Sequence, residues 1–379
     1  MGSSVRSERF VFPLFEITEV TEATEKRLVG PEVSGEPASG RGPAPRFLQA
    51  SFCAMAFAAA LLAAGCGGGN HSASGEVHFE AHMQRQLVVA FSQANNAEPY
   101  RAAQNAFMTR LFAADKDVRL AISDAQQDNS KQVAQVETFI REKPDLLIVA
   151  PNERAALTAV MGQAMDAGIP VICLERDILQ PNYRTYIHSD NVAIGRLAGQ
   201  FIVDQLLKKY GKPKGNVVAM RGLLGVEGEI NRDRGAKEIL DRYPEIRIVA
   251  DPVADWIQAK AKDRMTEVLR AQPHIDVVYG HNDPMAVGAY LSAKELGREQ
   301  EIIFVGVDGL GGPAGGIQKV IDGVLAATFV YPLCVDKAVE IGRRMLHEPG
   351  FRPEKEYVID SLMVTKENAA GMYRRFTVP

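Results

Sequence analysis

Polar side chains that can hold hydroxyl groups recur where the apolar runs of this sequence end. Glu175-Arg176 follows one apolar run, Asn282 follows another, and Asp308 and Tyr331 close two more. A hydroxyl group both donates and accepts hydrogen bonds, and carboxylate, amide and guanidinium groups together match both roles. A cluster of these side chains would therefore suit a small polyhydroxylated ligand.

The same residues could instead be turn residues and helix caps. This alternative is strongest for Asp283, because Asp283-Pro284 is typical of an N-cap followed by the first helical residue. It is weaker for Glu175-Arg176, after which no helix start is visible. Trp256, the only tryptophan, could be a core residue, as aromatic side chains commonly are. Its place at a predicted strand-to-helix junction favours a pocket, where its ring would stack on the apolar face of a sugar.

The sequence gives little support for catalysis or for a metal site. We find no nucleophile–base pair, metal-ligand spacing or phosphate loop, and we expect no cofactor and no metal. Residues 222–228 lack the G-x-G-x-x-G spacing, and Glu227 and Glu229 would repel phosphate, so we interpret this segment as a loop with pocket contacts. Glu175 and Asp308 could form the carboxylate pair of an enzyme acting on sugars, which stays a minor alternative.

Short apolar runs and amphipathic stretches alternate from Gln86 onward, which predicts strands and helices in turn. The predicted strands are 87–91, 118–122, 146–150, 170–174, 185–189, 216–220, 246–250, 276–281, 302–307 and 325–331. The predicted helices are 100–114, 130–141, 154–167, 191–209, 229–242, 257–271, 284–296, 313–322 and 333–346. This alternation indicates an α/β fold with parallel sheets covered by helices on both faces.

These units are too many for one compact sheet, so we expect two similar lobes. The chain would first change lobe near Ser189-Asp190, because no helix separates the strand that ends there from the strand before it. Ligands of open parallel sheets bind beyond the carboxyl ends of the strands, where the polar residues described above fall.

The front of the chain resembles an export signal. Residues 1–45 are rich in Glu, Thr, Gly and Pro, and they are either disordered or translated from a wrong start. Residues 46–66 form a basic and apolar signal peptide that ends at Cys66, the predicted lipidation site, although Ala63 stands where the motif usually has leucine. Residues 67–85 then form a tether, in which two histidines at helical spacing lack a third metal ligand.

Composition limits the classes of partner. Hydrophobic residues make up 46% and charged residues 24% of the 379 residues, and the net charge is -4, so we expect a globular protein without a nucleic-acid partner. Four cysteines are too few for a disulfide scaffold, and whether Cys173 and Cys334 pair is left open. No apolar run after residue 66 is long enough to span a membrane.

Four segments of the sequence are similar to those of a known protein family. They are Ile172-Cys173-Leu174-Glu175-Arg176, Asn231-Arg232-Asp233-Arg234-Gly235, the run from His281 to Ala289, and Val305-Gly306-Val307-Asp308-Gly309. Across residues 86–365 the chain resembles the periplasmic sugar-binding proteins of the ribose-binding type, whose lobes are shared with LacI-type repressors. The resemblance implies two doubly wound lobes joined by a three-strand hinge, here 86–189 plus 332–358 and 190–331 plus 359–379.

The resemblance also implies a sugar pocket. It assigns ligand contacts to Ser92, Asn96, Tyr100, Glu175, Arg176, Arg232, Trp256, Asn282, Asp308 and Tyr331. The chain departs from the family at three of these places. Only Tyr100 remains where two aromatic residues are usual, Glu175 replaces an aspartate, and Tyr331 stands where glutamine is common. These departures make ribose itself a doubtful ligand.

We therefore expect a monomeric lipoprotein of the cell envelope that captures a sugar or polyol by hinge closure and delivers it to an ABC permease. The alternative is a module that presents the bound sugar to a membrane receptor or sensor kinase. A LacI-type repressor is excluded, because residues 1–85 hold a signal sequence and no helix-turn-helix.

Overall fold

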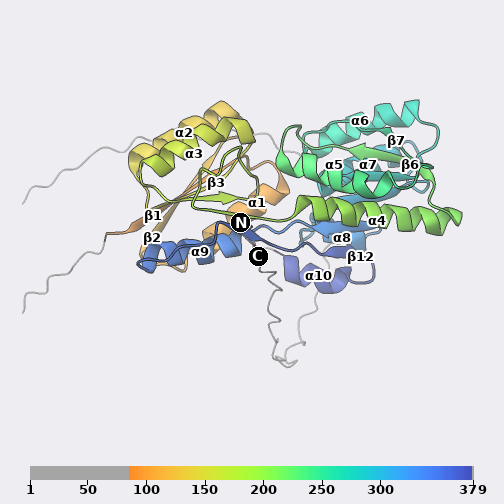
Figure 1. Ribbon diagram of the computed structural model, residues 1–379. Helices are drawn as coiled ribbons and strands as arrows, with labels where there is room; N and C mark the ends of the chain where they lie inside the picture. Colours follow the sequence, from red (N-terminus) through yellow and green to blue (C-terminus); the bar gives the residue numbers. More distant parts are fainter. Residues whose placement is uncertain (1–84, 378–379) are drawn as a thin grey trace, which may run out of the picture. The chain divides into compact units, whose positions relative to one another are not determined.

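The structure, a computed structural model, describes residues 85–377 (Figure 1). The predicted extension, the signal peptide with Cys66 and the tether up to residue 84 lie outside the described residues. Among residues 85–377, no helix is both long and apolar enough to cross a membrane.

The first lobe contains a six-stranded sheet with the order β11-β5-β4-β3-β1-β2, in which all neighbouring strands are parallel. Its elements are β1 (Leu87–Gln93), α1 (Pro99–Phe112), β2 (Val118–Asp124), α2 (Asn129–Glu142), β3 (Leu146–Ala150), α3 (Arg154–Asp166), β4 (Val171–Leu174), β5 (Thr185–His188), α9 (Val335–His347) and β11 (Glu356–Val358).

The second lobe contains a sheet with the order β12-β10-β9-β8-β6-β7, in which only β12 is antiparallel to its neighbour. Its elements are α4 (Asn191–Tyr210), β6 (Gly215–Met220), α5 (Glu227–Leu240), β7 (Ile246–Ala250), α6 (Gln258–Ala271), β8 (Val277–Gly280), α7 (Asp283–Glu295), β9 (Ile303–Asp308), α8 (Gly316–Ile321), β10 (Ala327–Val330), β12 (Met363–Thr365) and α10 (Ala369–Phe376).

The two sheets repeat one topology. In both, the first strand of the lobe lies between the second and the third, so the order reverses beside β1 and beside β6. Such a reversal opens a crevice at the carboxyl ends of the strands on each side of it. The predicted α/β class with two parallel-sheet lobes is confirmed.

Each sheet is buried on both faces, which explains why its strands are continuous apolar runs. In β3, Leu146 and Ile148 face the cluster under α1 and α9, while Leu147 and Val149 face the cluster under α2 and α3. In the second lobe, α4 and α5 cover one face, and α6, α7 and α8 cover the other. Figure 1 shows helices on both sides of each sheet.

The chain passes between the sheets in three segments, which begin at Ser189, Tyr331 and Ile359. The first and third are joined because the amide of Ile359 donates to the carbonyl of His188 at 2.7 Å. The second and third are joined because the amide of Val330 donates to the carbonyl of Leu362 at 2.8 Å. These bonds form the three-strand hinge that the resemblance implied; the residue limits of the lobes stay a prediction.

Local signals explain most element ends. Asp128 is the N-cap of α2, because its carboxylate accepts from the amide of Lys131 at 2.9 Å, and Gly211 is the C-cap of α4 in the left-handed conformation. The helix predicted at 313–322 is shorter than expected, because Gly315 is its N-cap and α8 ends at Ile321. The sequence pattern did not predict β11, β12 or α10, because runs of three, three and eight residues are too short for a reliable pattern.

Helices α4 and α5 approach so closely that only glycine fits between them. A Cβ atom on Gly195 would lie 2.3 Å from the carbonyl oxygen of Arg232, and one on Gly235 would lie 2.1 Å from that of Val192. Gly371 in α10, by contrast, has no atom within 4 Å of the place where its Cβ would be.

We predict that Gly195→Ala lowers the free energy of unfolding by about 1–3 kcal/mol, because the new methyl group forces α5 away from α4. The matched variant Gly371→Ala should raise it by up to about 1 kcal/mol, since alanine is the better helix former. Urea denaturation followed by circular dichroism measures both. Equal midpoints for the two variants would contradict the close contact.

His281, just after β8, is buried in the second lobe. Neither ring nitrogen has a hydrogen-bond partner among the described residues, and the ring lies 5.1 Å from that of Tyr279. Burial, reinforced by the charge of Arg232, lowers the pKa of His281 well below its ordinary value. The folded protein therefore keeps this imidazole neutral at a pH where the unfolded chain takes up a proton.

Stability should consequently fall as the pH drops below about 6.5, the ordinary histidine value, with a contribution from His281 of up to about 1.4 kcal/mol per pH unit. We predict that His281→Phe makes this loss shallower, whereas the same change at the exposed His347 does not. Urea midpoints between about pH 7.5 and 5 test this. A parallel pH dependence in parent and His281→Phe would show that the imidazole is not the cause.

Candidate functional site

One cleft collects the residues that follow the carboxyl ends of strands in both sheets. It is narrow and partly open to solvent, and about 20 Å³ of it can hold the centre of a water molecule, which is the room that one buried water needs. Its lining residues are Glu98, Tyr100, Arg101, Glu175, Arg176, Val226, Gly228, Arg232, Trp256, Asn282, Asp308 and Tyr331. Both lobes and the second hinge segment therefore contribute to a single site.

Eight of the ten predicted ligand residues line this cleft, and two do not. Ser92 is still inside β1, and its hydroxyl is buried against Gln132 of α2, whose amide donates to it at 3.3 Å. Asn96 is exposed, and its side chain accepts from the amide of Asn105 at 3.0 Å. Both residues support the loop and helices after β1, and the structure does not bring them to the cleft.

Glu175 is the central residue on the side of the cleft that the first lobe forms. One carboxylate oxygen lies 2.5 Å from a guanidinium nitrogen of Arg101, and the other accepts from the hydroxyl of Tyr331 at 2.8 Å. Arg176 is 3.8 Å away and also donates to the carbonyl of Asn152 at 3.0 Å. Burial alone would raise the pKa of Glu175, but Arg101, Arg176 and the Tyr331 hydroxyl together lower it, so the carboxylate is ionised.

Tyr331 connects the two lobes at the hinge. Besides its bond to Glu175, its ring stacks on that of Tyr100 with centroids 5.1 Å apart, and the guanidinium of Arg232 lies 4.2 Å from its centroid. The hydroxyl of Tyr100 in turn donates to the carbonyl of Pro332 at 2.6 Å. The tyrosine at 331 thus combines a hydrogen bond with stacking.

Trp256 lies between cations of the two lobes. The guanidinium of Arg176 is 5.8 Å and that of Arg232 is 5.6 Å from its ring, within the range of cation–π attraction. The indole lies on the backbone of Gly222, where a Cβ atom would be 2.2 Å from the ring. Gly222 therefore makes room for the indole, and the loop 222–228 reaches the cleft through Val226 and Gly228.

A second network holds Arg232. Its Nε donates to the side-chain oxygen of Asn191 at 2.9 Å, and another nitrogen donates to the carbonyl of His281 at 2.5 Å. The amide of Asn191 donates to Glu227 at 2.8 Å and lies 3.3 Å from the hydroxyl of Tyr331. Burial raises the pKa of Glu227. This network connects the start of α5 to the hinge and, through Tyr331, to the first lobe.

The predicted N-cap at Asp283 is wrong by one residue. Asn282 caps α7, because its side-chain oxygen accepts from the amide of Met285 at 2.9 Å, while its nitrogen donates to the carbonyl of Trp256 at 3.1 Å. The carboxylate of Asp283 is buried and accepts from Thr328 at 2.6 Å and from the amide of Gly309 at 2.8 Å. The amide side chain of Asn282 therefore fixes Trp256 as well as lining the cleft.

Burial raises the pKa of Asp308 in the cleft lining and of its neighbour Asp283, which is not part of that lining. The pKa of Asp283 rises to about 6. That of Asp308 rises well above its ordinary value, because it is buried and also faces the charge of Asp283. The two carboxyl groups of the cleft therefore differ in proton affinity: Glu175 is an acceptor on one wall, and Asp308 on the other wall binds a proton more readily.

Three cleft residues adopt backbone conformations that favour glycine. The φ angles are 68° at Glu175, 70° at Trp256 and 135° at Asp308. Such conformations cost about 1–3 kcal/mol each and persist where the surroundings fix them, often at functional sites. Glu175 directly follows β4, Asp308 is the last residue of β9 and Trp256 lies in the loop before α6, so each of the three turns into the cleft at the end of an element.

Sequence reasoning missed Arg101, the cleft residue with the shortest ion pair. It directly follows Tyr100 on α1, is only 1% exposed, and also donates to Gln104 at 3.0 Å. The sequence gives no sign that this arginine is buried, because its charge is offset by Glu175, which lies far away in the chain. Glu98, Val226 and Gly228 were also missed as individual residues.

Two buried donors of the cleft have no partner among the described residues, the Nε of Arg101 and the indole nitrogen of Trp256. Buried polar groups are almost always hydrogen-bonded, so both are free to meet a polar ligand. Within residues 85–377, no group of three or more His, Cys, Asp or Glu side chains could hold a metal ion. The question left open for Cys173 and Cys334 is answered, since both are buried and free.

Known proteins share this architecture. The periplasmic binding protein domain family matches residues 89–332. The chain is 32% identical over 232 residues to the galactofuranose-binding protein YtfQ of Escherichia coli (strain K12), covering 59% of this chain and 71% of that protein.

Two solved structures each have a TM-score of 0.71. The fructose-binding periplasmic domain of the hybrid two-component system BT1754 is 36% identical and covers 76% of this chain and 94% of its own. An ABC transporter solute-binding protein from Bacillus halodurans C-125, with bound myo-inositol, is 27% identical and covers 77% and 98%. With its two parallel-sheet lobes and its cleft between them, the chain belongs to the periplasmic binding protein family.

Proposed function

We propose that this protein captures a monosaccharide or polyol in the cleft and delivers it to an ABC importer. The observation that carries the proposal is the lining of the cleft, where two carboxyl groups with opposite pKa shifts, three guanidinium groups and an indole face one small space. These groups supply the donors, the acceptors and the apolar face that a polyhydroxylated ring needs.

The size of the cleft limits the ligand. The room between the walls is enough for about one water molecule, so the lobes must move apart to admit a ligand, and a single sugar ring or cyclitol requires less movement than an oligosaccharide. Each additional hydroxyl can meet a donor that now lacks a partner, the Nε of Arg101 or the indole nitrogen of Trp256. The names of the relatives, which bind galactofuranose, fructose and myo-inositol, agree with this class.

Binding without catalysis is favoured by the way Glu175 is held. Its pKa is lowered while that of Asp308 is raised, an asymmetry that glycoside-cleaving enzymes also use. Both oxygens of Glu175, however, are engaged, one by Arg101 and one by Tyr331. A carboxylate fixed in this way orients a hydroxyl group better than it attacks a carbon atom.

The three-segment hinge supports transport by lobe closure, in which the ligand is enclosed and both lobes present a joint surface to a permease. A sensor role is the second candidate, because one similar structure is a domain of a hybrid two-component system. A permease gene beside the gene for this protein would favour transport, and a sensor kinase gene would favour sensing.

We predict that one member of a panel of free sugars, polyols and cyclitols raises the melting temperature of the full-length protein in mild detergent. A ligand that binds only the folded state adds about 2.7 kcal/mol at a hundredfold excess over its dissociation constant. A thermal shift across pentoses, hexoses, ketoses and inositols measures it. No shift with any member would overturn the sugar-binding proposal.

The cleft itself is tested with the ligand found in this way. Trp256→Ala and Asp308→Asn should each weaken binding at least about tenfold in calorimetry, because they remove the indole or the second carboxyl group. The matched change Asp263→Asn, on the exposed side of α6, should leave the affinity unchanged. Unchanged binding in both cleft variants would place the ligand elsewhere.

We further propose that Cys66 carries the lipid that anchors the protein to a membrane of the cell envelope. The support is the order of basic residues, apolar run and cysteine in residues 46–66. In cells fed a radiolabelled fatty acid, the parent protein should be labelled and found with membranes, whereas Cys66→Ser should be unlabelled. Cys53→Ser, in the same apolar run, is the control. Label in the Cys66→Ser variant would contradict the assignment.

A further inference from the structure

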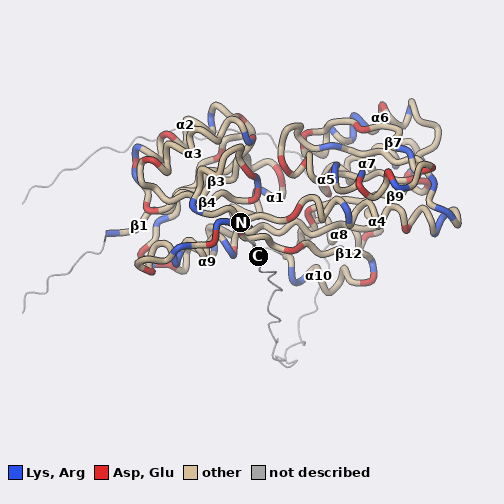
Figure 2. The backbone as a smooth tube through the Cα atoms, in the orientation of Figure 1, with Lys and Arg blue, Asp and Glu red and all other residues tan. Residues whose placement is uncertain are grey.

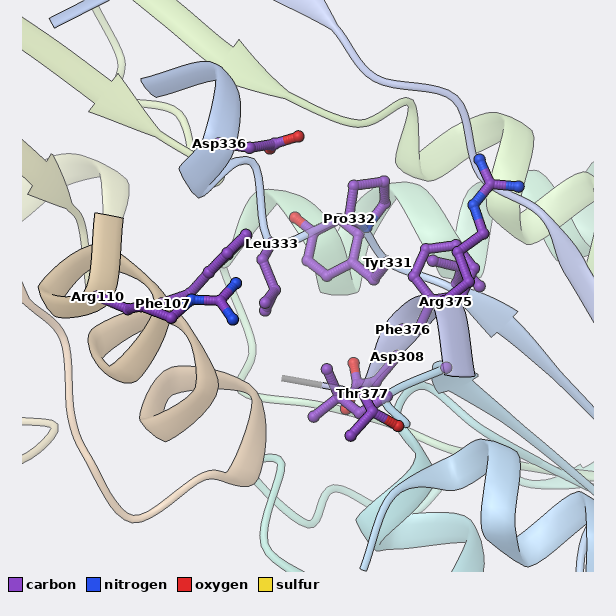
Figure 3. A pocket seen from close by; sticks show the side chains of 13 residues that line it. Phe107, Arg110, Asp308, Tyr331, Pro332, Leu333, Asp336, Arg375, Phe376 and Thr377 are labelled. Carbon is purple, nitrogen blue, oxygen red and sulfur yellow. The ribbon is translucent and has the colours of Figure 1, made fainter. Parts of the chain in front are cut away.

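Asp308, at the end of β9, belongs to the walls of three cavities. It lines the cleft, a third cavity between the starts of α7 and α8, and a hinge cavity that Phe107, Leu333 and Phe376 also line (Figure 3). The centre of a water molecule can occupy about 210 Å³ of the hinge cavity and about 110 Å³ of the third cavity. Water therefore reaches Asp308 from two sides besides the cleft.

The carboxyl group of Asp308 has no hydrogen-bond donor within residues 85–377, although the residue is only 5% exposed. The neighbouring Asp283 differs, because the hydroxyl of Thr328 and the amide of Gly309 donate to its two oxygens at 2.6 and 2.8 Å. Buried polar groups are almost always hydrogen-bonded. Asp308 is therefore the member of this pair that is left to bind a ligand.

Arg232 faces the same cleft without a carboxylate partner. Its guanidinium group donates to Asn191 and to the carbonyl of His281, but no acidic oxygen in the part of the chain that the structure describes lies within 4.0 Å of it. A sugar hydroxyl can donate one hydrogen bond and accept another. A single hydroxyl group that donates to Asp308 and accepts from Arg232 would therefore give both residues a partner.

The surroundings of Asp308 favour a proton on its carboxyl group. Burial raises the pKa of Asp308 most, followed by the charge of Asp283, which Arg232 partly offsets. Glu98 and Glu175 raise this pKa further. The other titratable or charged side chains that line the three cavities are Tyr100, Arg101, Arg110, Arg176, Lys319, Tyr331, Asp336 and Arg375. While the cleft is empty, Asp308 therefore binds a proton more readily than an ordinary aspartate does.

We propose that a sugar in the cleft releases a proton from Asp308 and leaves its carboxylate hydrogen-bonded to a hydroxyl group of the ligand, an inference that rests on the proposed function. The O–H bond of the carboxyl group breaks, the electron pair stays on the carboxylate, and the proton passes to water in the hinge cavity. The charge of Arg232 balances the new carboxylate. Because the pKa of Asp308 is lower with sugar than without, sugar affinity falls as the pH drops through the pKa of the empty site.

The proton is located first without sugar. Full-length protein in mild detergent, labelled with ¹³C at the aspartate carboxyl groups, is titrated by NMR, and Asp308→Asn identifies the signal. We expect Asp308 to titrate well above the ordinary value of about 3.9, and nearer to it in Asp283→Asn, whose amide group can keep both hydrogen bonds. The control Asp263→Asn, at an exposed position of α6, should titrate as the parent does. Titration of Asp308 at the ordinary value in the parent overturns the proposal.

The release is then measured with every panel member that raises the melting temperature, in a panel that includes fructose and myo-inositol. Calorimetric titrations at about pH 6 are run in phosphate and in imidazole buffer, which differ in ionisation enthalpy. The difference between the two heats gives the number of protons released. We expect up to about one proton per sugar in the parent and none in Asp308→Asn. Equal heats with a sugar that binds the parent overturn the release and leave the proposed function standing.

A pH series gives a second readout. The sugar dissociation constant of the parent should rise by up to about tenfold per pH unit between about pH 8 and 5. Asp283→Asn, which leaves the cleft lining intact, should move this rise to lower pH, whereas Asp263→Asn should not move it. A rise at the same pH in Asp283→Asn and the parent would contradict the role of the aspartate pair. If no panel member binds, the proposed function fails and the release falls with it.

Discussion

Burial of three guanidinium groups between the lobes is the constraint on which the cleft depends. Arg101, Arg176 and Arg232 are all less than 5% exposed, and a buried charge is tolerated only when it is paired and hydrogen-bonded. Glu175 pairs with the first two, and this demand holds its backbone at a φ of 68°. Arg232 is held instead by Asn191, a carbonyl group and two aromatic faces.

The pairing of these charges also ties the cleft to the hinge. Tyr331 belongs to a segment that passes between the lobes, yet it bonds Glu175 of the first lobe and stacks under Arg232 of the second. Any change in the angle between the lobes must therefore alter the contacts of the pocket residues themselves. Figure 2 shows acidic and basic residues interspersed over both lobes, so the concentration of charge in the cleft is a local feature.

The fold could be predicted because strands buried on both faces read as unbroken apolar runs, which alternate with helical patterns. The ligand residues directly after those runs, such as Glu175, Asn282 and Asp308, could be predicted for the same reason. Arg101 could not, since its buried state depends on a partner 74 positions later in the chain.

Errors arose where the exact end of an element matters. Ser92 was expected beyond β1, but the strand continues to Gln93, and alternation turns the Ser92 side chain toward α2. Asn96 follows the same strand, but it lies on the exposed side of the loop. The cap of α7 is displaced by one residue from Asp283 to Asn282, which frees the Asp283 carboxylate for the buried wall. The hydrophobic pattern of the sequence locates the end of a strand or helix to within a few residues, but tertiary packing decides which side chain there faces inward.

A ligand of this cleft would complete a polar network that is almost closed. Glu175 and the three guanidinium groups already have fixed partners in the protein, so they have little freedom left to reorganise. The remaining donors, the Nε of Arg101 and the indole nitrogen of Trp256, stand on opposite lobes. A leftover donor on each lobe can be satisfied by one ligand only while the lobes are together. Closure of the lobes and binding of the ligand therefore occur together, because both are needed to satisfy the remaining donors.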